Sequence, residues 1–132
     1  MLYMFDTNIV SKIMRDPHGP VAMRVLRTDP GQRKISVIVA AELRFGIAKR
    51  SSKELAAKLE ALVAEIGIVP FEPPADEIYA DIRARLEKAG TPIGGNAMLI
   101  AAHALALGAI LVTDNVREFS RIKSLKVVNW LR

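Results

Sequence analysis

The sequence of 132 residues contains no cysteine, so it can form neither a disulfide framework nor a thiolate metal site. Aromatic residues make up only 5% of it, and no apolar stretch approaches the roughly 18 residues that are needed to cross a bilayer. The apolar start reaches Asp6 after five residues and therefore does not have the pattern of a signal peptide. Together these absences predict a cytoplasmic protein.

The composition is that of a globular chain, with 51% hydrophobic and 25% charged residues. The length predicts a single domain over residues 1–132, large enough to bury a core without covalent staples. The hydrophobic residues are mainly alanine, isoleucine, leucine and valine, which is typical of α/β proteins.

Positive charge is concentrated in one part of the chain. The net charge is +5, and residues 24–53 contain eight basic side chains against two acidic ones. The eight basic side chains are Arg24, Arg27, Arg33, Lys34, Arg44, Lys49, Arg50 and Lys53. A basic face would suit a polyanionic partner, whereas composition alone favours ordinary charge for solubility.

Hydrophobic patterning predicts strands that alternate with helices. Short apolar runs predict five strands, at residues 2–5, 34–36, 68–71, 110–113 and 126–130. Helices are expected at residues 9–15, 20–28, 37–50 (capped by Ser36), from Ser51 or Ser52 to Gly67, 74–89, and 97–107 (capped by Asn96). This alternation predicts an α/β fold with a small parallel sheet and helices on both of its faces.

Two of the predicted strands end in nearly the same way. Asp6-Thr7-Asn8 follows the first, and Thr113-Asp114-Asn115 follows the fourth. Ligands of open parallel sheets bind at the carboxyl ends of the strands, and converging carboxylates favour a hard cation such as Mg²⁺ or Mn²⁺. Either aspartate alone is better explained as a turn or cap residue, but the pair favours a shared site.

Glu42 is a third candidate because it lies in an apolar helical stripe with Ile38, Val39, Phe45 and Gly46. A glutamate there loses hydration that only a partner or a metal can replace. The alternative is a position at the edge of the helix, with the carboxylate in solvent. Together with the two strand-end aspartates, Glu42 predicts a metal site of three carboxylates. His103, among alanines in a helix, is predicted to be a core residue without a catalytic role.

Several segments, taken in order, resemble the VapC toxins of the PIN-domain family. They are Met4-Phe-Asp-Thr-Asn8, Val39-Ala-Ala-Glu-Leu-Arg-Phe-Gly46, Gly90-Thr-Pro-Ile-Gly94, Ile100-Ala-Ala-His-Ala104 and Val112-Thr-Asp-Asn-Val-Arg-Glu-Phe119. The resemblance implies a three-layer α/β/α PIN-like domain, a Mg²⁺- or Mn²⁺-dependent endoribonuclease that cuts tRNA or rRNA, and inhibition by a VapB-type antitoxin. It also implies a homodimer or a hetero-oligomer of toxin and antitoxin.

Carried over residue by residue, the resemblance implies that Asp6 and Glu42 are the first two metal-binding acids. The last acid is Asp114 or Glu118, of which Asp114 is preferred, and Asn115 orients a ligand or a water molecule. The family usually has a further acid where this chain has Ala97. The chain is then either a naturally degenerate copy or a toxin disarmed by a deliberate change, and we favour the second.

These considerations predict a ribonuclease of a type II toxin–antitoxin pair whose activity is impaired by Ala97. The alternative is a catalytically inactive PIN-fold module that binds RNA or an antitoxin. A third hypothesis is a phosphoaspartate enzyme or receiver domain with Asp6 as the acceptor of phosphate, but the haloacid-dehalogenase type would have a second aspartate where this chain has Asn8.

Overall fold

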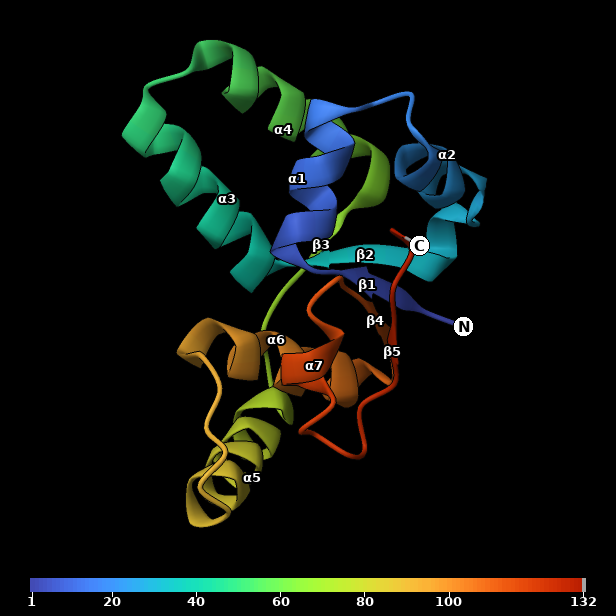
Figure 1. The fold of residues 1–132 in the computed structure, drawn as a ribbon. Coiled ribbons are helices and arrows are strands. Elements are labelled where there is room, and N and C mark those ends of the chain that lie inside the picture. Colours follow the sequence, from blue (N-terminus) through green and yellow to red (C-terminus); the bar gives the residue numbers. More distant parts are fainter. Residues whose placement is uncertain (132) are drawn as a thin grey trace.

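The apolar runs form a parallel sheet at the centre of the molecule. The computed structural model describes residues 1–131, and within them the sheet has five strands in the order β3-β2-β1-β4-β5 (Figure 1). The strands are β1 (Tyr3–Phe5), β2 (Arg33–Ser36), β3 (Ile68–Val69), β4 (Ile110–Val112) and β5 (Val127–Val128). All four pairings are parallel, which confirms the predicted α/β fold with a small parallel sheet.

Four of the five strands are shorter than the sequence predicts, and β3 and β5 differ most. β3 ends before Pro70, which has no N–H with which to extend the ladder. β5 ends at Val128 because the side-chain oxygen of Asn129 accepts a hydrogen bond from the Leu131 amide and turns the chain.

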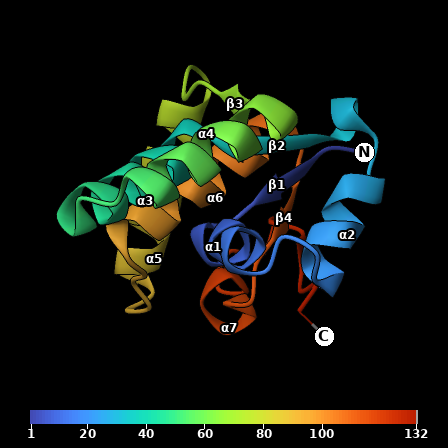
Figure 2. The same ribbon diagram turned by 90° about the horizontal axis from the view of Figure 1, so that it is seen from above.

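Helices cover both faces of the sheet, and this gives the three-layer arrangement (Figures 1 and 2). One face carries α1 (Thr7–Arg15), α2 (Pro20–Arg27), α3 (Val37–Arg50) and α4 (Lys53–Ile66). The other carries α5 (Ala75–Lys88), α6 (Gly95–Leu107) and α7 (Val116–Phe119). The four-residue α7 and a 3-10 turn at Pro30–Gln32 were not predicted, because such short segments show no periodicity. None of the helices described is long and apolar enough to cross a membrane.

Most of the helix ends follow the predicted signals. Ser36 caps α3, Ser52 caps α4, and α4 stops at Gly67. The predicted cap at Asn96 is wrong: α6 begins two residues earlier than expected, at Gly95, with Gly94 in the cap position. The amide of Gly94 donates a hydrogen bond to Glu118 Oε1 at 3.1 Å, so a distant acid rather than a local cap fixes this helix start.

The order of the strands determines where a site can lie. The chain runs from β1 to β2 on one side, and β4 pairs with β1 on the other side, so the connections diverge between β1 and β4. Crevices that bind ligands form outside the carboxyl ends of the strands at such a switch point. The segments that start at Asp6 and Thr113 leave the sheet there.

Candidate active site

Asp6 lies at the carboxyl end of β1, where it is also the N-cap of α1. Its carboxylate is held on both sides: Oδ1 accepts from the Thr7 amide at 2.8 Å, and Oδ2 accepts from the Thr113 hydroxyl at 2.7 Å. The residue is only 8% exposed. Burial raises the pKa of Asp6 above 3.8, the two hydrogen bonds oppose this, and the charges of Asp114 and Glu118 raise the pKa further.

Glu42 approaches Asp6 from the middle of α3. Its Oε1 accepts a hydrogen bond from the Thr7 hydroxyl at 3.2 Å, which links α3 to the first turn of α1. Loss of hydration on burial raises the pKa of Glu42 above 4.5, and the charge of Asp6 raises it as well. Hydrogen bonding by Thr7 and Asn96 lowers it in part. The carboxyl groups of Asp6 and Glu42, which repel each other, therefore lie in the same partly dehydrated region.

A cavity of about 190 Å³ contains both carboxylates, and we refer to it as the acidic cavity. Its lining consists of Asp6, Thr7, Asn8, Glu42, Asn96, Ala97, Ile100, Asn115 and Phe119. Ala97, the third residue of α6, presents a methyl group there. An aspartate at this position would thus add a third carboxylate to the cavity.

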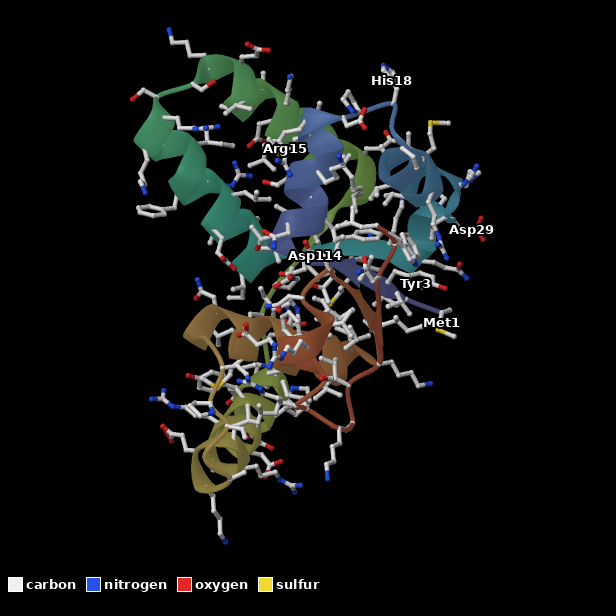
Figure 3. All side chains as sticks on the ribbon, in the orientation of Figure 1. Met1, Tyr3, Arg15, His18, Asp29 and Asp114 are labelled. Carbon is white, nitrogen blue, oxygen red and sulfur yellow. The ribbon has the colours of Figure 1, made fainter. Side chains whose placement is uncertain are left out.

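Asp114 lies at the rim rather than in the cavity. It is exposed, is not among the lining residues, and accepts a hydrogen bond at 3.2 Å from Asn8 Nδ2 (Figure 3). The structure therefore brings Asp6 and Glu42 together with position 97, while Asp114 acts on the cavity only through its charge and through Asn8.

Asn115 lines the cavity in the place where Asp114 was expected. Its side-chain amide donates to Glu118 Oε2 at 2.9 Å, and Glu118 also holds the Gly94 amide. These hydrogen bonds lower the pKa of Glu118, with Asn115 contributing most. Glu118 thereby ties α7 to the start of α6. Thr7, Asn96 and Thr113 also belong to the site, and the sequence carried no signal for them beyond their places beside the predicted acids.

The donor set can be compared with what a divalent cation requires. Within residues 1–131 no three His, Cys, Asp or Glu side chains are grouped closely enough to hold a metal. The acidic cavity offers two carboxylates, with the amide oxygens of Asn96 and Asn115 nearby. Mg²⁺ is commonly bound by one or two carboxylates and keeps several waters, so these residues fit Mg²⁺ or Mn²⁺. Such a cation would relieve the repulsion between Asp6 and Glu42.

The basic segment is only partly available to a polyanion. Arg33 is 3% exposed and donates to the carbonyls of Val25 and Thr28 and to the Glu65 carboxylate. The expectation that Arg33 belongs to a basic surface is therefore wrong: it fastens α2 and α4 to β2. Arg44 pairs with a glutamate of α4, and Arg24 lies over the Trp130 ring at 4.5 Å.

Comparisons with known proteins agree with this architecture. The family model of the PIN domain matches residues 3–125. Ribonuclease VapC2 of Rickettsia felis is 39% identical over 132 residues, 98% of either chain. The tRNA(fMet)-specific endonuclease VapC of Shigella flexneri is 33% identical over 129 residues, 97% of either chain.

Solved structures give the same result. VapBC2 from Rickettsia felis, bound to a DNA fragment from its promoter, superposes with a TM-score of 0.87 at 36% identity, covering 98% of this chain and 99% of that one. VapBC-1 from nontypeable Haemophilus influenzae gives 0.85 at 34% identity over the whole of both chains. The fold is that of a PIN domain. The chain belongs to the PIN-domain family and, within it, to the VapC ribonucleases.

Proposed function

We propose that this chain is the toxin of a type II toxin–antitoxin pair and that it cleaves RNA phosphodiester bonds with Mg²⁺ or Mn²⁺. The observation that carries the proposal is the pairing of Asp6 and Glu42 in one cavity, each with a raised pKa. Two carboxylates in one partly buried cavity are costly without a cation between them.

In this proposal Asp6 and Glu42 hold the cation. The chemistry that it supplies when bound is activation of water and neutralisation of charge on the phosphate. Thr113 and the Thr7 amide orient the Asp6 carboxylate, while the Thr7 hydroxyl orients Glu42. Asp114 contributes negative charge from the rim through its contact with Asn8, and Asn115 offers an amide to a ligand or a water molecule.

The proposed substrate class is structured RNA, tRNA before rRNA. Support comes from relatives in Shigella flexneri and Salmonella typhimurium that are named tRNA(fMet)-specific endonucleases, at 33% and 30% identity. Initiator tRNA is thus the first substrate to test.

Position 97 is proposed to limit the activity. With alanine there the cavity has two carboxylates, and an aspartate would supply a further ligand. Changes in the groups that support a metal site typically cost about 10- to 100-fold in affinity or activity, so the loss of a direct ligand should cost at least that.

Cleavage assays on tRNA and rRNA with Mg²⁺ or Mn²⁺ test the proposal. We expect weak cleavage by this chain, at least about tenfold stronger cleavage by an Ala97→Asp variant, and none when Asp6→Asn is added to that variant. A chelator should abolish cleavage. Absence of cleavage by the Ala97→Asp variant on every RNA would refute the enzymatic proposal.

A VapB-type antitoxin is the proposed partner. An apolar groove of about 340 Å³ between α1, α2 and α4 is lined by residues that include Ile13, Met14, Val25, Leu26 and Leu62. It could receive apolar side chains of an antitoxin, and an arginine of that partner could replace the cation beside Asp6. The exposed Phe45 of α3, next to a hollow lined by Ile38 and Leu99, is a candidate contact in a homodimer.

A second candidate function is a PIN-fold module that binds RNA or antitoxin without cutting. Ala97 is the observation that favours it, because it leaves the acidic cavity one carboxylate short of the family pattern. Equal lack of cleavage by this chain and by its Ala97→Asp variant, together with retained RNA binding, would support this candidate over the nuclease.

A further inference from the structure

A second hollow adjoins the acidic cavity. It has a volume of about 320 Å³, lies between α1, α3 and α4, and shares Thr7 and Glu42 with the acidic cavity. The hydrogen bond between these two residues forms the boundary between the hollows. We refer to it as the arginine groove, since Arg15 and Arg50 line it together with Ser11 and Gly46.

Helices α1 and α3 each line this groove with three residues at the same spacing. Thr7, Ser11 and Arg15 follow at four-residue steps on α1, as do Glu42, Gly46 and Arg50 on α3. At 1.5 Å per residue, each arginine lies about 12 Å along its helix from the residue at the boundary. Figure 3 shows Arg15 at the end of α1 that is remote from the sheet. The groove thus leads from the acidic cavity to a pair of guanidinium groups.

Neither arginine is neutralised by an acidic neighbour. Both side chains are exposed, and neither forms an ion pair with any residue between 1 and 131. Arg15 Nε reaches the Ser11 carbonyl at 3.4 Å. The carboxylate that lines the groove is Glu42, at the opposite end. The end of the groove that is farther from the acidic cavity therefore carries positive charge.

The absence of a side chain at Gly46 leaves open space in the groove, and the packing of the fold does not require this space. It lies within α3, where glycine is less favourable than alanine, and its φ is not in the left-handed region. A Cβ at this position would meet no atom within 4 Å, so no internal contact requires glycine. What the missing side chain does provide is close access to the helix backbone for a ligand in the groove.

We propose that the arginine groove binds the sugar–phosphate backbone of the RNA strand next to the linkage that is cut, with Arg15 and Arg50 contacting its phosphates. The inference rests on the proposed ribonuclease function. Guanidinium groups bind phosphate oxygens through paired hydrogen bonds. One anionic strand can occupy both hollows, meeting arginines in the groove and a cation in the acidic cavity. A peptide that occupied both hollows would need acidic side chains at the arginines of the groove and a basic side chain at the carboxylates of the acidic cavity.

The test measures RNA binding without cleavage. A fluorescein-labelled single-stranded oligoribonucleotide of mixed sequence is titrated with the full chain in EDTA, at several salt concentrations, and anisotropy is recorded. We expect the double variant Arg15→Gln with Arg50→Gln to bind at least about tenfold more weakly at low salt. Its plot of log affinity against log salt should be shallower by about 1.4, since each phosphate contact on a single strand contributes about 0.7.

The matched control removes the same charge elsewhere. The double variant Arg83→Gln with Arg85→Gln lies on α5, on the other face of the sheet, and should leave both affinity and slope nearly unchanged. Equal losses in the two double variants would mean that only net charge matters and would overturn the proposal. So would unchanged RNA binding together with lost binding of the cognate antitoxin, which would make the groove a protein-binding surface.

A second pair of variants tests the role of Gly46. Gly46→Leu should fill the groove and weaken RNA binding about as much as the loss of an arginine, while Gly46→Ala should bind nearly as the unaltered chain does. Neither should unfold more easily, because both residues are better helix formers than glycine. RNA affinity unchanged by Gly46→Leu would overturn the proposal. Because these titrations contain no divalent metal, a failure here is distinguishable from a failure of metal-dependent cleavage by the Ala97→Asp variant.

Discussion

The hydroxyl of Thr113 donates a hydrogen bond to Asp6 Oδ2 at 2.7 Å, which joins the residues that directly follow β4 and β1. Thr113 is fully buried, and its oxygen also accepts from the Asn115 amide at 3.0 Å. One side chain therefore orients the carboxylate in the acidic cavity and the turn that brings Asn115 to it.

Replacement of Thr113 by valine, which has nearly the same shape, should remove both contacts. We expect the free energy of unfolding to fall by about 1–3 kcal/mol, because the buried Asp6 carboxylate and the Asn115 amide each lose a partner. Thr113→Ser keeps the hydroxyl and should retain most of the stability. Urea unfolding of the two variants measures the difference, and equal stability of the two would show that the hydroxyl does not contribute.

Ala97→Asp should destabilise the metal-free chain while it strengthens metal binding. The loss of alanine's helix propensity, about 0.7 kcal/mol, is largely offset by the favourable position of an acid in the first turn of α6. What remains is repulsion from Asp6 and Glu42, which we expect to lower the stability by about 1 kcal/mol or more at neutral pH.

Thermal unfolding in EDTA and in Mn²⁺ checks this expectation. The melting temperature of the Ala97→Asp variant should be below that of the unaltered chain in EDTA, and should rise more on addition of Mn²⁺. Ala97→Asn serves as the uncharged control. If Mn²⁺ shifted the alanine and aspartate forms equally, position 97 would not face the cation.

The sequence was sufficient to predict the parallel sheet and the approach of Glu42 to Asp6, but not the order of the strands that creates the switch point. The sheet follows from short apolar runs that alternate with helices, and the approach of Glu42 follows from a charged residue in an apolar stripe. The place of Asp114 could not be predicted in the same way. An aspartate after a predicted strand indicates a turn at the carboxyl end of the sheet, but it does not show which side chain of the turn points into the site. Here the Thr113 hydroxyl bonds to Asp6 and to the Asn115 amide, and Asn115 lines the acidic cavity.

Other differences also arise from long-range contacts. The start of α6 depends on Glu118, which is 24 residues away from Gly94. Arg33 looked like a surface charge in a basic segment, yet it is buried: its Nη1 donates to the carbonyls of Val25 and Thr28, and its Nη2 pairs with the Glu65 carboxylate. A local pattern contains no information on such partners.

Glu42 and Asp114 should differ in their importance for metal binding. Glu42→Gln removes a carboxylate from the acidic cavity, and we expect it to weaken Mn²⁺ binding by about 10- to 100-fold. Asp114→Asn removes an exposed charge at the rim, and an effect of up to about fivefold is expected. Isothermal titration with Mn²⁺ in the Ala97→Asp background compares the two. A larger loss from Asp114→Asn would mean that Asp114 binds the cation directly.

His103 should make the stability depend on pH. It is 1% exposed, and its Nδ1 lies 2.7 Å from the Ser36 hydroxyl, which itself accepts a hydrogen bond from the Ile38 amide. Burial lowers the pKa of His103 below 6.5, and the Pro70 carbonyl and the Glu72 charge oppose this only in part.

A lowered pKa means that the unfolded chain binds a proton at a higher pH than the folded chain does. The contribution to stability is therefore complete above the unfolded value of 6.5 and is lost as the pH falls below it. The slope for one proton is at most about 1.4 kcal/mol per pH unit. Urea unfolding between pH about 7.5 and about 5.5 should show this loss in the unaltered chain and a smaller one in His103→Asn. Asp6 and Glu42 have raised pKa values, so their contribution to stability increases as the pH falls, which is opposite in sign to that of His103. This contribution is the same in the unaltered chain and in His103→Asn, and it cancels when the two pH profiles are subtracted. If both profiles had the same slope, His103 would not be the group that titrates.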